Sequence, residues 1–288
     1  MLIVKINGGL GNQMFQFAFY QYLKINNKEV YLDLSDFKVH NHHQGFELGK
    51  IFNLNFEEVP LTISKKYGYN QSGIVYRTLN KYFNTRLTKP TDFYEFDGVS
   101  LITKDQINQD IYFTGFWQNY YYINSLDEEL LRSNFKFKNR ITGSRNTQLI
   151  DFIKNKESVS VHVRRGDYIN NDNFQGICDE VYYHNSIDVI SNQYKNAIFV
   201  VFSDDIEWCK NIFNNNKKFI FVDWNKGSDS YFDMQLMSQC KHNIIANSTF
   251  SWWGAWLNCN PDKCVIMPKK WANLQTKNNL IGSNWITM

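Results

Sequence analysis

The stretch LIVKINGGLGNQMFQFAFYQYLKI, residues 2–25, indicates the fold class. Residues 2–6 are mostly apolar and are typical of a buried strand, and residues 7–12 predict a glycine-rich turn. From Gln13 to Ile25 the apolar residues recur at helical spacing, which predicts a helix, and a second strand-like run at 30–34 follows closely. This succession is typical of a parallel sheet with crossover helices, and therefore of an α/β protein.

The same alternation of strands and helices returns in the second half of the chain. Helices are predicted at 119–134, 145–156, 182–193, after Asp205, at 229–240 and up to about residue 257, and strands at 158–163, 198–202, 219–222 and 243–246. Between His40 and Asp110 the pattern is irregular, polar and aromatic, and it assigns no elements. We therefore predict two Rossmann-like domains, residues 1–145 and 146–288.

Composition narrows the class of protein. Hydrophobic residues make up 43% and charged residues 20% of the 288 residues, as in ordinary globular proteins. Aromatic residues, at 17%, are abundant enough to suit sugar-stacking surfaces, although most aromatics fill cores. A formal charge of +3 is compatible with a bound anion and too small for a nucleic-acid partner.

Cysteine usage and the lack of export signals indicate the compartment. The five cysteines are odd in number, scattered and without a Cys-x-x-Cys pair, so we expect reduced thiols. The N-terminus lacks the features of a signal peptide, and no segment reaches the roughly 20 apolar residues of a membrane helix. We expect a cytoplasmic protein, and peripheral association with the inner membrane stays open.

Three polar segments follow predicted strands, where ligands of open parallel sheets bind. The first is the loop of residues 8–13, whose glycines allow backbone to approach a phosphate or sugar closely. Its alternative interpretation is a tight turn, because it matches neither a dinucleotide fingerprint nor a P-loop.

The second segment, HVRRGD at 162–167, places two guanidinium groups and a carboxylate beyond a hydrophobic strand. Arginine suits phosphate because its planar fork donates two parallel charged hydrogen bonds. A structural Arg/Asp ion pair is the alternative. Because neighbouring residues of a strand point to opposite faces, we expect one arginine to bind ligand and one to be structural.

The third segment, NSTFSWW at 247–253, is a strand end with hydroxyls at the start of a helix. Unpaired N–H groups and the helix dipole make such a place an anion site, and a plain N-cap is the alternative. Trp252 and Trp253 are expected in the core. Asp204 and Asp233 add carboxylates that can accept hydrogen bonds from guanine, with a capping or solvated aspartate as the alternative.

These segments together resemble the bacterial α-1,2-fucosyltransferases, of the glycosyltransferase family 11 type. The matching stretches are GGLGNQMFQFAF at 8–19, HVRRGDY at 162–168, SDD at 203–205 and CKHNIIANSTFSWWGAWL at 240–257. The resemblance implies a GT-B fold, in which two Rossmann-like domains face a cleft, with inversion at the anomeric carbon. It also implies a GDP-fucose donor bound by the C-terminal domain, an acceptor bound by the N-terminal domain, and no metal or other cofactor.

The resemblance further implies roles for single residues. Asn12, with Gly11 beside it, resembles the asparagine of a loop at the sugar diphosphate, and Arg164 resembles an essential arginine on the β-phosphate. His162 is placed beside the nucleotide by the same likeness. The other donor-binding residues that it implies are Ser248, Thr249 and Phe250 for pyrophosphate and nucleoside, Asp233 for guanine, and Asp204, whose match is looser.

The chemistry of the transfer suggests two catalytic residues. Breaking the bond between fucose and phosphate leaves negative charge on GDP, which a fixed cation such as Arg164 stabilises in the transition state. A single displacement also needs a base for the incoming hydroxyl, and Asp167 is the nearest motif carboxylate. Its alternative role is structural, as the partner of an arginine. The sequence contains no Asp-x-Asp pair, so we expect no metal at the diphosphate.

The acceptor implied by the resemblance is the 2-hydroxyl of a glycan with terminal galactose, in an oligosaccharide or glycolipid. We expect the irregular region 40–118 to bind it. Two other functions stay open, a fucosyltransferase of another linkage and a carbohydrate-binding protein without turnover.

Overall fold

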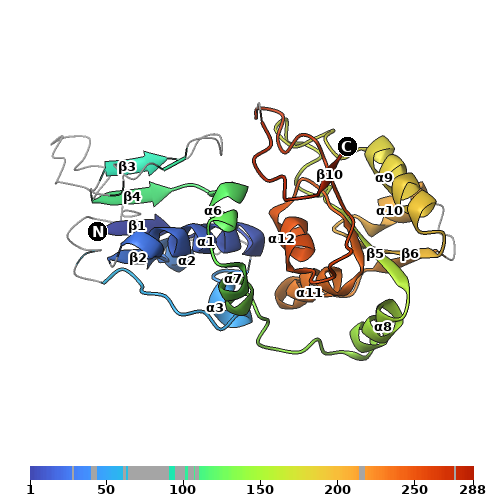
Figure 1. The fold of residues 1–288 in the computed structure, drawn as a ribbon, viewed down its shortest axis with the longest axis horizontal. Coiled ribbons are helices and arrows are strands. Elements are labelled where there is room, and N and C mark those ends of the chain that lie inside the picture. Colours follow the sequence, from blue (N-terminus) through green and yellow to red (C-terminus); the bar gives the residue numbers. More distant parts are fainter. Residues whose placement is uncertain are drawn as a thin grey trace. The chain divides into compact units, whose positions relative to one another are not determined.

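The protein consists of two compact units, Met1–Lys136 and Phe137–Met288 (Figure 1). The computed structural model describes residues 1–27, 29–39, 44–60, 63, 91–94, 101–102, 107, 110–213, 218–275 and 277–288. Each unit has its own parallel sheet with helices, which confirms the α/β class and the two Rossmann-like halves of a GT-B protein. Most of the expected acceptor region, 40–118, lies outside the described residues.

The division after Lys136 falls nine residues before the expected boundary at 145. Packing explains the difference, because the segment that leads into the second unit already belongs to its core. The ring of Phe137 stacks on Tyr231 with centroids 6.4 Å apart, and Ile141 is buried in one cluster with Leu149 and Leu236.

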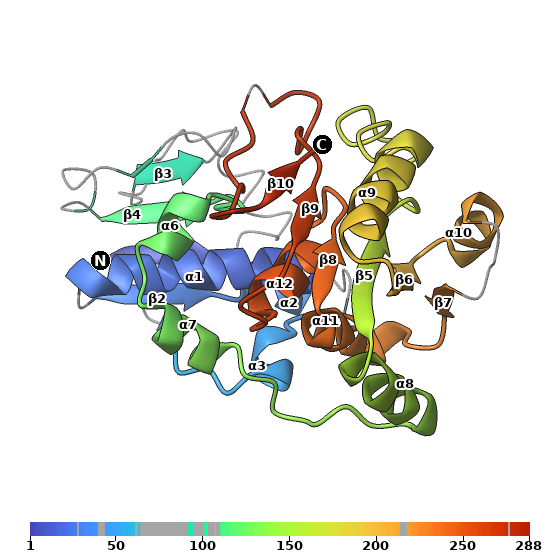
Figure 2. The same cartoon turned by 45° about the vertical axis from the view of Figure 1, so that its right-hand side comes forward.

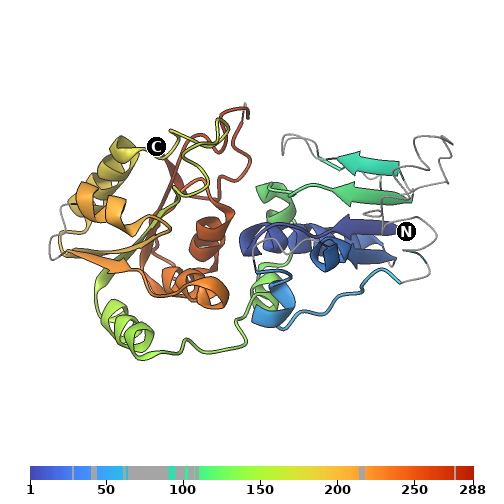
Figure 3. The same ribbon diagram turned by 180° about the vertical axis from the view of Figure 1, so that it is seen from behind.

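The first unit contains a four-stranded parallel sheet of order β2-β1-β4-β3 (Figure 3). Its strands are β1 (Leu2–Lys5), β2 (Val30–Asp33), β3 (Thr91–Tyr94) and β4 (Ile111–Thr114), and its described helices are α1 (Leu10–Asn26), α2 (Ser35–Val39), α3 (Leu48–Ile51), α6 (Tyr120–Asn124) and α7 (Glu128–Asn134). The predicted helix at 119–134 is two helices. Asp127 separates them because its carboxylate caps α7, accepting from the Leu130 N–H at 2.7 Å.

Helix α1 begins three residues earlier than predicted, at Leu10. Gly8 turns the chain with φ +76°, a conformation that glycine tolerates, and Gly9 is the extended N-cap residue. Gly11 and Asn12 therefore lie in the first turn of the helix and not in a loop before it.

The second unit contains a six-stranded parallel sheet of order β10-β9-β8-β5-β6-β7 (Figure 2). Its strands are β5 (Glu157–Val163), β6 (Ala197–Ser203), β7 (Phe219–Val222), β8 (His242–Ile244), β9 (Val265–Met267) and β10 (Ile286–Thr287), and its helices are α8 (Ser144–Lys154), α9 (Glu180–Gln193), α10 (Ile206–Ile212), α11 (Tyr231–Gln239) and α12 (Thr249–Leu257). The chain starts at β5, builds outward to β7 and returns to the other side of β5. This is the doubly wound order, with its switch point between β5 and β8.

Helices cover both faces of this sheet (Figure 2), and the side chains of β5 alternate between the two faces. Val159, Val161 and Val163 pack with residues of α9 and α10. Ser158, Ser160 and His162 therefore point to the other face, which carries α8, α11 and α12. There Trp252 and Trp253 are fully buried, which confirms the prediction that both belong to the core.

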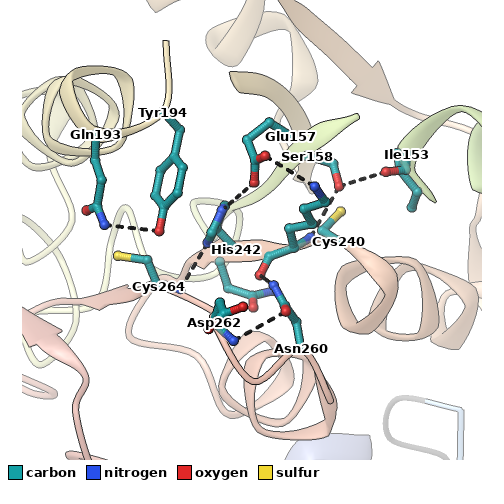
Figure 4. A network of polar contacts seen from close by, with 12 residues as sticks. Ile153, Glu157, Ser158, Gln193, Tyr194, Cys240, His242, Asn260, Asp262 and Cys264 are labelled. Carbon is teal, nitrogen blue, oxygen red and sulfur yellow. Dashed lines mark hydrogen bonds and ion pairs between the residues drawn. The ribbon is translucent and has the colours of Figure 1, made fainter. Parts of the chain in front are cut away.

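The amino end of this sheet is closed by a polar network (Figure 4). The Glu157 carboxylate lies 2.8 Å from His242 Nε2 and 3.2 Å from Lys241 Nζ, and the Cys264 N–H donates to His242 Nδ1 at 3.0 Å. The Tyr194 ring lies against the His242 ring, with centroids 4.1 Å apart. These contacts join β5, β8 and β9 at the end of the sheet away from the strand carboxyl ends.

Two further expectations concern the whole chain. All five cysteines are unpaired, as expected of reduced thiols. Within the described part of the chain, none of the helices combines the length and apolar character that a membrane crossing requires.

Candidate functional site

The switch point of the second sheet brings together two of the three segments singled out in the sequence. The loop after β5 carries residues 164–168, and the loop after the neighbouring strand β8 leads into α12. The Tyr168 hydroxyl donates to the Asn247 carbonyl at 3.1 Å and so ties one loop to the other. In doubly wound sheets, ligands bind at this position, outside the carboxyl ends of the strands.

Arg164 lies at the centre of the first loop, between two carboxylates. Its Nη2 lies 2.7 Å from Asp167 Oδ1, and its Nη1 lies 3.1 Å from Asp204 Oδ2. The Arg164 side chain is 34% exposed and Asp167 is 61% exposed, whereas Asp204 is 26% exposed. The guanidinium fork is therefore held in a fixed direction and remains accessible to an anion.

Asp204 organises this loop from the end of the adjacent strand β6. Its second oxygen accepts from the Arg165 backbone N–H at 2.9 Å, so both oxygens hold the loop. The close approach favours a glycine at position 166, because a Cβ there would lie 2.9 Å from Asp204 Oδ2 and would force the aspartate or the loop to shift. We therefore interpret Asp204 as a positioning residue, and direct contact with the nucleoside stays a prediction.

Arg165 has a different environment from Arg164. Its Nε lies 3.1 Å from Asp205 Oδ2, and its guanidinium lies over the Trp208 ring at 4.1 Å. Asp205 is also the N-cap residue of α10, where it accepts from the Trp208 N–H. We therefore interpret Arg165 as the structural arginine of the pair, and ligand binding by Arg164 stays a prediction.

His162 is buried at the end of β5, on the face that carries α11 and α12. Its Nδ1 is buried without a hydrogen-bond partner among the described residues, and its ring centroid lies 5.9 Å from that of Phe250. Burial lowers the pKa of His162 to about 4, with Arg164 acting in the same direction and Asp204 opposing it. The imidazole is therefore neutral at physiological pH, and a ligand that supplies a polar partner would satisfy it.

The N-terminus of α12 provides the second half of the switch point. Ser248 is the N-cap residue, in an extended conformation, and its side chain makes no capping hydrogen bond. Thr249 and Phe250 form the first turn of this nine-residue helix. The orphan N–H groups and the dipole of such a helix end favour an anion, and the unpartnered His162 beside Phe250 points independently to a ligand here.

Asp233 belongs to a separate group, in the first turn of α11, the helix that packs beside α12. Its Oδ1 accepts from Asn225 Nδ2 at 2.7 Å. Burial raises the pKa of Asp233 to about 7, and the hydrogen bond from Asn225 partly opposes this rise. The carboxyl group therefore changes its charge near neutral pH.

The first segment, the glycine loop, is fixed within the first unit by two buried glutamines that our sequence analysis missed. Gln13 donates to the carbonyls of Gly8 and Gly45 at 2.8 and 2.9 Å. The Asn7 backbone N–H donates to the Gln16 side-chain oxygen at 2.9 Å, and the Gln16 amide group donates to Asn7 Oδ1, also at 2.9 Å. The side-chain oxygen of Asn12 accepts from Gln118 at 3.1 Å. Two glutamines three residues apart within the mostly apolar stretch 13–20 of this helix were the available signal.

Comparisons with known proteins identify the family of this chain. The family model of glycosyl transferase family 11 matches residues 1–288. The α-1,2-colitosyltransferase of Escherichia coli is 36% identical over 97% of this chain and 95% of its own length. The O-antigen biosynthesis glycosyltransferase WbnK of Escherichia coli is 33% identical over 98% of this chain and 99% of its own.

More distant matches include human galactoside α-(1,2)-fucosyltransferase 1, at 34% identity over 34% of this chain and 28% of its own length. Among solved structures, the α-1,6-fucosyltransferase NodZ soaked with GDP-fucose aligns with a TM-score of 0.46 at 14% identity, over 89% of this chain and 91% of its own. The match of the family model over the whole chain shows that this protein is a member of glycosyltransferase family 11.

Proposed function

We propose that the protein transfers L-fucose from GDP-β-L-fucose to the 2-hydroxyl of a galactose-terminated glycan, with inversion at the anomeric carbon and without a metal. The observation that carries this proposal is the group of Arg164, His162 and the N-terminus of α12 at the switch point of the second sheet. A cation, a helix N-terminus and a buried polar atom without a partner form a site suited to a nucleoside diphosphate.

Arg164 is the residue that we assign to the β-phosphate. Asp167 is more exposed than Asp204 and holds Arg164 through a single contact, so phosphate oxygens can take its place on the guanidinium. Asp204 is also bound to the Arg165 N–H and would keep Arg164 aimed at the diphosphate. The guanidinium would then stabilise the charge that develops on GDP as the glycosidic bond breaks.

The same exchange would give Asp167 a second role. An aspartate oxygen that is held by a guanidinium is not available to an incoming hydroxyl group. When the diphosphate occupies Arg164, Asp167 is released and can accept the proton of the incoming 2-hydroxyl. The alternative is that Asp167 only holds Arg164 in place before the donor arrives.

The nucleoside is assigned to the layer of α11 and α12. His162 and Phe250 lie together at the start of α12, where an aromatic base can pack against them. Asp233 provides an acceptor for the N–H groups of guanine. In the first unit, Gly11 and Asn12 at the start of α1 are proposed to contact the sugar diphosphate, and this unit is proposed to bind the acceptor.

The charge pattern of the site supports transfer without a metal. The carboxylates at the strand ends, Asp167, Asp204 and Asp205, are each engaged by an arginine. Their oxygens are therefore directed at guanidinium groups. Arg164 and the N-terminus of α12 supply the positive potential that a metal would otherwise bring to the diphosphate.

A second candidate is transfer of colitose, the 3-deoxy counterpart of fucose. The observation in its favour is the 36% identity to an α-1,2-colitosyltransferase over nearly the whole chain. The two donors share GDP and differ at one hydroxyl of the sugar, so the site described above suits both. A site that hydrogen-bonds the 3-hydroxyl would reject colitose, and a site that lacks this contact would accept it.

The experiment that tests the proposal incubates the protein with GDP-fucose or GDP-colitose and a panel of galactose-terminated acceptors. We expect release of GDP and a product whose mass and NMR spectrum show fucose in α-1,2 linkage. Faster transfer of colitose would select the second candidate. Another linkage, or glycan binding without release of GDP from either donor, would contradict the proposal.

A further inference from the structure

A relay of side-chain amides with no role in the account above ends on Asp233. Asn225 donates to Asp233 Oδ1 at 2.7 Å. Asn146, which is buried on α8, exchanges two hydrogen bonds with Asn225, of 2.9 and 3.1 Å. Asn146 also accepts from Trp224 Nε1 at 2.6 Å and donates to the Thr142 carbonyl at 3.0 Å.

The two ends of this relay fix the orientation of both amides. An indole N–H can only donate, so the Asn146 atom that faces Trp224 is the oxygen, and a carbonyl can only accept, so the atom that faces Thr142 is the nitrogen. The orientation of Asn146 in turn fixes that of Asn225, whose NH₂ group must then face Asp233. Asp233 Oδ1 is therefore always an acceptor, and any proton on this carboxyl group resides on Oδ2.

We propose that Asn225, held by Asn146 and Trp224, is a positioning residue that keeps Asp233 Oδ1 a hydrogen-bond acceptor toward the nucleobase and so sets the preference for guanine. The inference rests on the proposed GDP-sugar donor. Guanine presents N–H donors along the edge where adenine presents the N1 acceptor. A carboxylate that must accept can therefore pair with the N1–H and N2–H groups of guanine together, whereas it repels adenine N1 and leaves adenine only its N6 amino group as a donor.

The surroundings of Asp233 make this control effective near neutral pH. Burial raises its pKa to about 7, and the Asn225 hydrogen bond acts against that rise. On the neighbouring elements, Arg145 and Asp223 pair with each other, Lys226 and Asp229 are exposed, and α12 carries no charged residue. His162 on the facing side of β5 is neutral at this pH. Asn225 is then the polar group that most directly favours the ionised carboxylate.

The test measures the dissociation constants of GDP and ADP from pH 6 to 9 by calorimetry, for the wild type and for Asn225→Ala. In the wild type, GDP should bind more tightly as Asp233 ionises with rising pH. Loss of one hydrogen bond to a charged group should weaken GDP about tenfold at pH 7. The midpoint of the pH profile should move upward, and ADP binding should stay unchanged. Trp224→Phe, which keeps a ring but frees the Asn146 amide, should act in the same direction more weakly.

Asn155→Ala is the matched control, because Asn155 lies at the end of α8 and its side chain donates to the Asp151 carbonyl of the same helix. It should leave both dissociation constants unchanged. An equal loss of GDP and ADP binding in Asn225→Ala, or an unchanged GDP/ADP ratio and pH midpoint, would overturn the inference. If Asn225→Ala does not fold, the same criteria apply to Trp224→Phe. A wild type that binds ADP as tightly as GDP would instead overturn the proposed donor, and this inference with it.

Discussion

Substitution of Arg164 by lysine tests whether this arginine has a catalytic role or only a structural one. Lysine keeps the positive charge but loses the planar fork, so it cannot contact two phosphate oxygens in parallel. The two ion pairs of Arg164, at 2.7 and 3.1 Å, are partly exposed to solvent, and their loss should cost at most about 1 kcal/mol of folding stability. The fold should therefore survive, and the effect should appear in turnover.

The expected loss of turnover follows from the position of Arg164 at the leaving group. Removal of one preorganised donor to developing negative charge costs about 3 to 4 kcal/mol, which corresponds to a hundredfold to a thousandfold lower kcat. The assay is the rate of GDP release at saturating GDP-fucose and acceptor, together with a melting curve for each variant. Because the contact strengthens in the transition state, kcat should fall more than the affinity for GDP.

Arg165→Lys is the matched control, on the neighbouring residue of the same loop. It removes the stacking on Trp208 and the Asp205 contact, so it should lower the melting temperature by a few degrees. Its kcat should stay within a few-fold of the wild type. A folded Arg164→Lys protein with nearly normal kcat would refute the assignment, as would equal losses of kcat in the two variants.

Three further predictions concern the base, the metal and the acid stability of the second unit. If Asp167 is the base, Asp167→Asn should reduce transfer at least about a hundredfold with GDP affinity within a few-fold of the wild type; reduced GDP affinity or a lower melting temperature would indicate the structural role instead. Transfer should persist after dialysis against EDTA, and an activity that chelator abolishes and magnesium or manganese restores would contradict metal-independent transfer. Burial acts to raise the pKa of Glu157, but the hydrogen bonds with His242 and Lys241 outweigh burial and lower this pKa below 4.5. The stabilisation by the ionised Glu157 is therefore present above about pH 4.5 and is lost as the pH falls through the folded-state pKa. Urea unfolding of Glu157→Gln should show a deficit of about 1 kcal/mol at pH 7 that narrows below pH 4.5, and a deficit independent of pH would exclude this origin.

The strands and helices of the second unit were predictable because each carries its own signal. The strand at 219–222 was predicted at its observed bounds, and most others were placed within one or two residues. The short strands β3, β4, β9 and β10 were missed. Length alone does not explain this, because β7 is also four residues long. The missed strands are defined by pairing with neighbours that are distant in sequence, and their own residues carry no pattern that announces this pairing.

The site was predictable only in part, for a similar reason. The sequence places Arg164 and Ser248 at strand ends. Only the strand order of the folded sheet, in which β5 and β8 are neighbours, shows that their loops lie together. The choice between Arg164 and Arg165 required the positions of Asp205 and Trp208, which contact Arg165 from the next βα unit. Buried amides such as Asn146 have no periodic signature, because their partners come from residues that are far apart in sequence.

The central claim is that a nucleoside diphosphate binds at the switch point of the second sheet, and a crystal structure of the protein with GDP tests it most directly. The account predicts that the β-phosphate lies within hydrogen-bond distance of the Arg164 guanidinium and the N-terminus of α12. It also predicts that Asp167 is released from Arg164 and that guanine donates to Asp233. GDP bound elsewhere, or bound here with the Arg164–Asp167 ion pair intact, would contradict the account.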